Sequence, residues 1–349
     1  MNHRWKVSTN GFLLACLLSL AWGADAQAAN QISPDLIQAA QKEGDVIVYT
    51  TTRRGVMDAL AGLFQKQFGI KVTFTRKQTG AIVQMVTAEK MAGRIRFDVV
   101  STGDESVVRR WLKEGLLVPY KPRTASLIPD TIAKNDAYLN YGIVSIQTVI
   151  YSAKRVPLGR APKDWVDLLH PRWKGRIAMA DPRTAGGTRT LVRLMVDKLG
   201  WSYFEKLAKN EPLLIKSQAG LDRMVLSGEA DVALSVAEAD ALLSVAKGEP
   251  IGIVYPKSFT LALWLNSAVA KNAPHPHSAR LWQDFSLTTE AQTIYSKYGY
   301  NTSNPDTPAF HKRPKLTELE LFPVDAEHLR KTSKGMLERF EQIMKKARD

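Results

Sequence analysis

Cysteine is nearly absent from this chain of 349 residues, and the single copy, Cys16, lies close to the N-terminus. One cysteine forms no disulfide within the chain and no thiolate metal site. Histidine is also scarce, with 6 copies, and the sequence contains neither a His-Glu-x-x-His motif nor a nucleophile elbow. We therefore expect no catalytic residues, no metal ligands and no cofactor, which favours a binding protein over an enzyme.

Long apolar runs are missing as well. The N-terminal run from Gly11 to Leu20 has about ten residues, whereas a membrane-spanning helix needs about 20. It follows the basic residues Arg4 and Lys6 and precedes small residues at 24–26, which is the order of an export signal. We expect residues 1–26 to be a signal peptide, cleaved after Ala26 or after Ala28, and the mature protein to be soluble in the periplasm.

A lipid anchor is the alternative interpretation of this N-terminus. The segment Leu13-Leu14-Ala15-Cys16 resembles a lipoprotein processing box. However, few apolar residues precede Cys16, and the apolar run continues beyond it. Cleavage without lipid attachment is therefore the favoured interpretation.

Acidic residues are outnumbered by basic ones, 34 against 48, which gives a formal net charge of +14. Loss of residues 1–26 removes Arg4, Lys6 and Asp25, a net +1, and leaves +13. The basic residues are scattered, and an export signal argues against a nucleic-acid partner. The charge is suited to attracting a small anionic ligand or the head groups of a membrane.

Strands and helices alternate in two separate parts of the chain, which predicts two α/β lobes. The first lobe comprises residues 27–142, the second 143–255, and residues 256–349 are expected to return to the first lobe and end in helices. The run from Ile143 to Tyr151 is long enough to cross between them, and a second crossing is expected to end near Tyr255. Expected strands are 45–49, 70–75, 97–100, 143–151, 176–180, 213–216, 231–235, 251–255 and 261–264. Expected helices are 54–67, 80–91, 104–114, 188–199, 221–226, 237–246, 278–287, 289–298 and 326–346.

Ligands of parallel sheets lie beyond the carboxyl ends of the strands, and pockets form between domains. The first loop in such a place contains Thr50, Thr51, Thr52 and Arg53. Its hydroxyls, a helix N-terminus and an arginine are suited to binding an anion. The alternative is an ordinary helix cap, for which one threonine is sufficient.

Two further loops have the same position and similar chemistry. Ser101 and Thr102 follow the third strand, next to Asp104, which could simply cap the next helix. In the second lobe, Thr184, Gly186, Gly187 and Thr188 stand between a strand and a helix. Glycine permits close approach of a ligand to the backbone, and consecutive N–H groups can form an anion nest.

The remaining candidate ligand-binding residues are Ser235, Glu238 and Tyr255. Ser235 ends a predicted strand, and Glu238 and Asp240 follow it on the next helix. These carboxylates could bind an amine or a metal, serve as the base of a hydrolase, or simply be solvated. Tyr255 could line the cleft or belong to the core.

Six segments between about Gly44 and Asn304 have a recognisable pattern. They are Val46-Ile-Val-Tyr-Thr, Phe97-Asp-Val-Val, Val149-Ile-Tyr-Ser, Pro162-Lys-Asp-Trp-Val-Asp-Leu, Trp173-Lys-Gly-Arg-Ile-Ala-Met-Ala-Asp-Pro and Ser227-Gly-Glu-Ala-Asp-Val-Ala. Together they resemble the iron(III)/thiamine/phosphonate-type solute-binding proteins of ABC importers, which have the type II periplasmic-binding fold. The resemblance implies two lobes that close over a ligand, an ABC permease in the inner membrane as partner, and a monomeric protein.

The ligand-binding positions depart from the iron-binding members of that family. Those members typically have adjacent tyrosines after the strand that ends here at Ser235, where this chain has Val236-Ala-Glu-Ala-Asp240. The sequence therefore favours an anion such as a phosphonate, phosphate ester or carboxylate. The alternatives are a ferric or ferric-chelate binding protein, an exported enzyme on the same scaffold, and a receptor for a membrane sensor.

Overall fold

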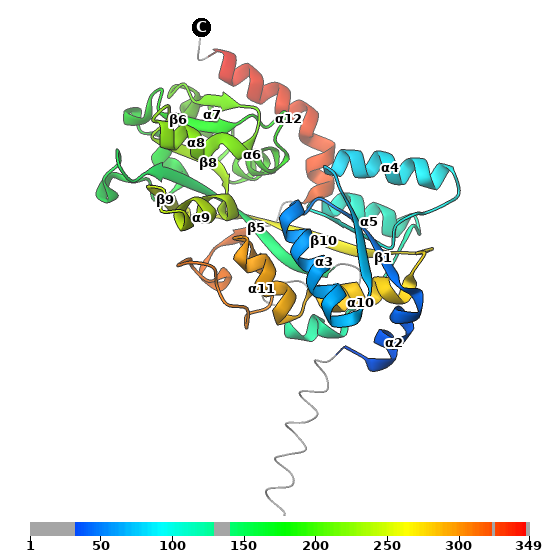
Figure 1. Ribbon diagram of the computed structural model, residues 1–349. Helices are drawn as coiled ribbons and strands as arrows, with labels where there is room; N and C mark the ends of the chain where they lie inside the picture. Colours follow the sequence, from blue (N-terminus) through cyan, green and yellow to red (C-terminus); the bar gives the residue numbers. More distant parts are fainter. Residues whose placement is uncertain (1–31, 129–139, 323–324, 347–349) are drawn as a thin grey trace, which may run out of the picture.

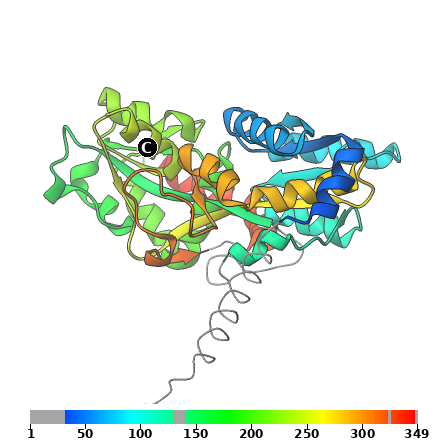
Figure 2. The same ribbon diagram turned by 60° about the horizontal axis from the view of Figure 1, so that its bottom comes forward.

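The computed structural model describes residues 32–128, 140–322 and 325–346, and shows two α/β lobes (Figures 1 and 2). The expected signal peptide, its cleavage sites and Cys16 lie outside these residues. One continuous sheet runs through both lobes in the order β2-β1-β3-β10-β5-β8-β6-β7. The predicted two-lobed fold is confirmed, and no described helix is long and apolar enough to span a membrane.

Lobe 1 is built on three parallel strands, and they end at the same edge of the sheet. These strands are β1 (Asp45–Thr50), β2 (Lys71–Arg76) and β3 (Val99–Thr102). The helices α3 (Arg54–Phe68) and α4 (Thr79–Met91) connect them, α5 (Glu105–Lys113) follows β3, and α2 (Pro34–Glu43) precedes β1. Alternate residues of β1 enter two cores: Val48 packs with α3, and Tyr49 packs with α4 and α5.

Lobe 2 repeats this plan with the parallel strands β6 (Ile177–Ala180), β7 (Leu213–Ile215) and β8 (Val232–Ala237). Its helices are α6 (Gly186–Leu199), α7 (Trp201–Ala208), α8 (Leu221–Ser227) and α9 (Glu238–Ala246). Short 3-10 helices occur at Arg123–Leu127, Leu158–Arg160, Trp165–Leu169, Pro171–Trp173, Gln218–Gly220 and Leu316–Glu318.

Two antiparallel strands connect the lobes, β5 (Asn140–Ser152) and β10 (Thr260–Ala270). Ile143 of β5 lies in a lobe 1 core and Val149 in a lobe 2 core. Along β10, Leu261 packs in lobe 2 and Val269 in lobe 1. The predicted crossing near Tyr255 is wrong, because β9 (Ile251–Val254) only pairs with the lobe 2 half of β5.

After β10, the chain returns to lobe 1 and then leaves it again. Helix α10 (Pro276–Ser286) packs against α2, and α11 (Thr289–Lys297) packs against α3. The short strands β4 (Leu117–Val118), β11 (Asn301–Thr302) and β12 (Leu321–Phe322) pair with β10 or β5. The final helix α12 (Ala326–Lys346) departs from the predicted return, because Met336, Phe340 and Met344 pack in the lobe 2 core while the helix also touches α5 (Figure 1).

Candidate ligand-binding site

The loop from Thr50 to Arg53 joins β1 to α3 in lobe 1. Thr51 N–H donates to Ser101 O at 3.0 Å, and Thr52 N–H donates to Thr50 Oγ1 at 3.0 Å. The N-cap position of α3 is Arg53, and no side chain caps the helix. The threonines are therefore not helix caps, and Thr52 Oγ1, in a residue that is 4% exposed, has no hydrogen-bond partner among the described residues.

Arg53 reaches from lobe 1 to lobe 2. Its Nε donates to the Tyr300 hydroxyl at 3.0 Å, and its guanidinium lies 3.1 Å from Asp240 Oδ1 in α9 and 4.8 Å from the centre of the Tyr300 ring. Burial lowers the pKa of Arg53, but Tyr300 and Asp240 raise it more, and the net shift is upward. Burial also raises the pKa of Asp240, although Arg53 opposes this. The arginine is thus charged and already paired with a carboxylate of lobe 2.

Ser101 and Thr102 lie on different faces of the sheet. Thr50 and Ser101 both line a small cavity inside lobe 1, together with Ser267 and Ser286. Thr102 is on the opposite face of the sheet, where its hydroxyl lies 2.9 Å from Thr79 Oγ1 at the start of α4. The alternative interpretation is correct for Asp104, which accepts a hydrogen bond from Ser106 N–H and caps α5.

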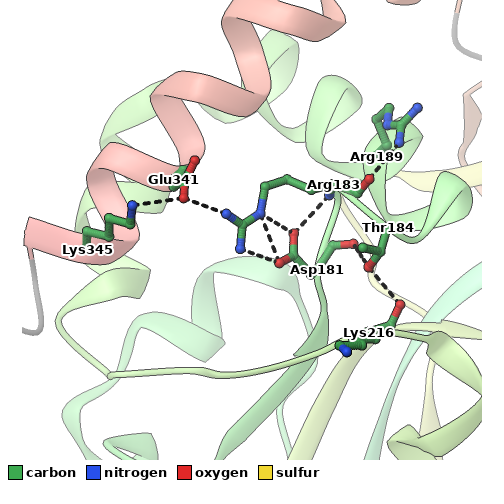
Figure 3. Close-up of polar contacts among 7 residues, drawn as sticks. All are labelled: Asp181, Arg183, Thr184, Arg189, Lys216, Glu341 and Lys345. Carbon is green, nitrogen blue, oxygen red and sulfur yellow. Dashed lines mark hydrogen bonds and ion pairs between the residues drawn. The ribbon is translucent and has the colours of Figure 1, made fainter.

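The arginines of the lobe 2 loop bind groups of the same loop and of α12. Arg183 forms ion pairs with Asp181 at 2.6 Å and with Glu341 of α12 at 2.6 Å (Figure 3). Arg189 donates to Pro182 O at 3.1 Å and to Arg183 O at 3.0 Å. Thr184 is exposed, and its hydroxyl donates to Lys216 O at 2.7 Å. These contacts hold the loop in place and occupy the guanidinium groups of Arg183 and Arg189.

Helix α6 begins with two glycines, and a side chain would have space at the first and would meet a neighbouring side chain at the second. The helix begins at Gly186 with Ala185 as an N-cap that offers no side-chain hydrogen bond. A Cβ atom on Gly186 would meet nothing within 4 Å, whereas one on Gly187 would lie 2.9 Å from Gln218 Oε1. Gly187 is therefore needed to admit Gln218, and Gly186 leaves the helix N-terminus accessible.

Ser235 anchors a buried polar cluster behind the start of α6. It is a strand residue with a φ of 63°, in the left-handed region that is costly for serine, and it lies at a register shift between β8 and β5. Thr188 Oγ1 donates to Ser235 Oγ at 3.0 Å, and Gln218 donates to Ser235 O and to Gln147 Oε1. Sequence reasoning missed both glutamines; the only signal for Gln218 was its place after the strand at 213–216.

Glu238 and Tyr255, two of the candidate ligand-binding residues, belong to one buried hydrogen-bond network. Glu238 is 1% exposed and accepts hydrogen bonds from the Tyr255 hydroxyl at 2.6 Å and from Asn301, with Arg313 at 3.8 Å. Burial raises the pKa of Glu238 and of Tyr255, and lowers that of Arg313. The network joins α9 of lobe 2 to the segment around β11 of lobe 1, so its role is to connect the lobes.

The sequence of this chain matches a known protein family. The sequence model of the family described as "Bacterial extracellular solute-binding protein" matches residues 46–301, well over half of the chain. The chain belongs to this family. This solute-binding protein is also 25% identical over 328 residues to an uncharacterized protein of Haemophilus influenzae, covering 88% of this chain and 93% of that one.

Solved structures share the fold of this solute-binding protein. Iron-bound HitA from Pseudomonas aeruginosa is 22% identical, with a TM-score of 0.71, covering 86% of this chain and 99% of that one. AfuA from Actinobacillus pleuropneumoniae, with exogenous fructose-6-phosphate bound, is 24% identical, with a TM-score of 0.67, covering 87% and 97%. A substrate-binding protein of an ABC transporter from Agrobacterium tumefaciens has a TM-score of 0.72 at 16% identity, covering 86% and 94%. The predicted resemblance to solute-binding proteins of ABC importers is confirmed.

The acidic, histidine and cysteine side chains of the described residues are the groups from which a metal site would be built. In residues 32–128, 140–322 and 325–346, no group of three or more His, Cys, Asp or Glu side chains could hold a metal ion. In the segment 236–240, where iron-binding members typically have adjacent tyrosines, Val236 is buried in the core and Glu238 is hydrogen-bonded to Tyr255. The arrangement is suited to hydrogen bonding by hydroxyls, amides and helix N-termini.

Proposed function

We propose that this solute-binding protein is the periplasmic component of an ABC importer, and that it captures a small anion between its lobes. The observation that carries the proposal is the pair of helix N-termini at α3 and α6. Each follows a strand of a different lobe, and neither has a side-chain cap. The first N–H groups of such helices lack partners within the helix, and the helix dipole favours negative charge there.

The ligand class follows from the groups around these two helices. Arg53 supplies a positive charge in the cleft, and the excess of basic residues would attract anions from solution. A phosphate ester, phosphonate or carboxylate fits this combination. The neighbour AfuA has fructose-6-phosphate bound, which agrees with an anionic ligand for this fold. We further propose that residues 1–26 direct export and are removed without lipid attachment, with an intact mass beginning near Gln27 or Ala29.

Bare ferric iron is the weaker candidate, although HitA is iron-bound. Fe(III) prefers hard anionic oxygen ligands. The carboxylate that follows β8 here, Glu238, is buried and bonded to Tyr255 and Asn301. Asp240 lies against Arg53 at 3.1 Å. Neither is available without breaking a contact between the lobes.

A substitution at Gly186 tests the proposal directly. Because a Cβ there meets nothing within 4 Å, Gly186→Asp should fold, and a carboxylate at a helix N-terminus should leave the melting temperature unchanged or higher. The same carboxylate would occupy the anion position, so we expect at least a tenfold loss of affinity. Ligands would first be found by a thermal-shift screen of phosphonates, sugar phosphates, carboxylates, thiamine and ferric salts, then measured by titration calorimetry.

Gly186→Asn is the matched control, with the same shape and no charge. It should bind more tightly than the aspartate variant. If Gly186→Asp binds every hit with the affinity of the unmodified protein, the ligand lies elsewhere. A hit list containing only ferric salts would also contradict the proposal.

A further inference from the structure

Strand β5 changes its pairing partners between Ile146 and Gln147. The strands β10 and β11 pair with β5 residues up to Ile146, whereas β8 and β9 of lobe 2 pair with residues from Gln147 onward. Hinges between domains consist of a few residues that absorb the change in backbone angles. Because both sets of partners end here, these two residues are the point at which β5 can bend between the lobes.

The side chain of Gln147 is buried at this point and is bound to Gln218 of lobe 2. Gln147 is 2% exposed, and its Oε1 accepts a hydrogen bond from Gln218 Nε2 at 2.6 Å. The same Nε2 donates to Ser235 O at 2.5 Å. A carbonyl oxygen only accepts hydrogen bonds, so the nitrogen of the Gln218 amide must face Ser235 and Gln147. The amide oxygen of Gln218 is then directed at a different neighbour.

That neighbour is the first turn of helix α6. A Cβ atom on Gly187 would lie 2.9 Å from Gln218 Oε1 and 3.2 Å from its Nε2, closer than side-chain carbons come to other atoms. Gly187 is not among the glycines with a positive φ, so its backbone conformation is open to any residue. The Gln218 amide, and not the backbone, therefore excludes a side chain here. One amide group thus contacts the bend of β5 and the start of α6.

Ser235 connects the same two elements a second time. Its Oγ accepts from Thr188 of α6 at 3.0 Å, and its O accepts from Gln218. Its φ of 63° coincides with the register shift of β8 against Thr148 and Val149 of β5, directly after the bend. A strained residue of this kind persists only while its surroundings hold it in place. The contacts from α6 and Gln218 therefore help to set the geometry of β5 at the bend.

We propose that Gln218 is a positioning residue that couples the start of α6 to the bend of β5. Coupling requires a contiguous set of contacts that has a second arrangement. A group that displaces the Gln218 amide from beside Gly187 also breaks its bonds to Gln147 and Ser235, and this changes the angle at which β5 holds the lobes. The link to a ligand rests on the proposed function, in which an anion meets the start of α6, whereas the coupling itself is a property of the protein alone.

Distances between two spin labels, one on each lobe, test the coupling in the protein without ligand. The labels are attached through Lys66→Cys in α3 and Lys206→Cys in α7, which are exposed positions, and Cys16, the only cysteine of the chain, is changed to serine. Gly187→Ala places a Cβ atom against the Gln218 amide and removes no hydrogen-bond donor. We expect double electron–electron resonance to show a shifted or broadened distance distribution in this variant, with the circular dichroism spectrum unchanged.

Gln218→Met tests the same contact from its other side. Methionine keeps the length of the side chain and removes the amide, so the distance distribution should change in the same way. Gln292→Met is the matched control, because Gln292 is fully buried in lobe 1, donates to Ser286 O at 2.8 Å and accepts from Ser303 N–H at 3.1 Å. The control should lower the melting temperature and leave the distance distribution unchanged.

An unchanged distribution in folded Gly187→Ala or folded Gln218→Met would overturn the inference, because a displaced or missing amide would then leave the bend of β5 unaltered. If one of the two variants fails to fold, the other decides. An equal change in Gln292→Met would also overturn the inference, because any lost buried hydrogen bond would then loosen the lobes. None of these outcomes bears on the proposed anion, which Gly186→Asp tests separately.

Discussion

The strand-to-helix loops of the two lobes both contain threonine and arginine, yet their polar groups have different partners. In lobe 1, Arg53 pairs with Asp240 of the other lobe, and Thr52 Oγ1 has no partner among the described residues. In lobe 2, Arg183 and Thr184 are bound by groups of lobe 2 and α12 (Figure 3). In these two loops, we expect the groups that are satisfied within lobe 2 and α12 to fix the shape of the loop, and Arg53 and Thr52 of lobe 1 to respond to a ligand.

This difference predicts a division of labour between the lobes. Substitutions in the satisfied groups of lobe 2 should lower the free energy of unfolding. Substitutions in the lobe 1 loop should act mainly on affinity. Each of the following variants tests whether one residue acts mainly on the free energy of unfolding or mainly on ligand affinity.

The largest effect is expected at Glu238, where lobe 2 joins lobe 1. Glu238→Ala removes the partner of Arg313, whose side chain is 5% exposed, and of Tyr255 and Asn301. Breaking a buried ion pair on one side costs about 3–5 kcal/mol, because the other charge stays buried alone. Urea unfolding should show a loss of this size.

Glu238→Gln is the control for this prediction. It keeps an oxygen that can accept from the Tyr255 hydroxyl, so its loss of stability should be smaller than that of Glu238→Ala. If Glu238→Ala unfolds like the unmodified protein but binds no ligand, Glu238 is a ligand group after all, and lobe 2 is not the structurally satisfied half.

A smaller but still large effect is expected for binding at Arg53. A hydrogen bond to a charged group contributes about 1.5–3 kcal/mol, so Arg53→Ala should weaken anion binding tenfold or more. Asp240→Asn should have the opposite effect, a several-fold gain in affinity, because Asp240 competes with the ligand for the guanidinium at 3.1 Å. Calorimetry on both variants measures this. A loss of affinity in Asp240→Asn would mean that Asp240 positions Arg53 instead.

The strands and most of the helices that form the cleft could be predicted from the sequence, because their apolar residues repeat with clear periods. The second crossing was missed for a local reason: the polar residues Asn266 and Ser267 interrupt the apolar pattern of β10, so the sequence predicted a strand over 261–264 only. The helix α12 was predicted, but its partner was not. Its apolar spacing shows which face is buried and says nothing about which lobe buries it.

The sequence allowed candidate site residues to be chosen by residue type and by their position after a strand. It did not predict which groups their side chains contact. Arg183 and Asp181 are two residues apart, so that pair was open to sequence reasoning, whereas Glu341 comes from a helix far along the chain. The same is true of Glu238, whose partners Asn301 and Arg313 belong to the other end of the sequence. Residue chemistry limits what a loop can bind, and only the fold determines which groups are already occupied.

An intermediate effect is expected at Thr188 in lobe 2. Its buried hydroxyl donates to Ser235 Oγ at 3.0 Å, and it sits at the start of α6, so it has a structural and a candidate binding role. Thr188→Val should cost about 1 kcal/mol of stability, the value of one hydrogen bond, together with a loss of affinity. Thermal melts and calorimetry separate the two. Weaker binding at unchanged stability would place Thr188 with the groups of lobe 1.

The smallest effect is expected at Arg183, the lobe 2 counterpart of Arg53. Burial raises the pKa of Asp181, but hydrogen bonds from Arg183 outweigh this and leave the pKa below its ordinary value of 3.8. The stability that this pair contributes is therefore present above pH 3.8 and is lost as the pH falls through the lower, folded-state pKa. Because Arg183 is half-exposed, Arg183→Ala should cost under about 1 kcal/mol at pH 7, and less at pH 3. Arg189→Ala, which removes only contacts to carbonyl groups, should keep the acid dependence of the unmodified protein. Affinity should not change in Arg183→Ala, since its guanidinium faces Asp181 and Glu341; a tenfold loss would show that both lobes present an arginine to the ligand, and the contrast between the two loops would no longer hold.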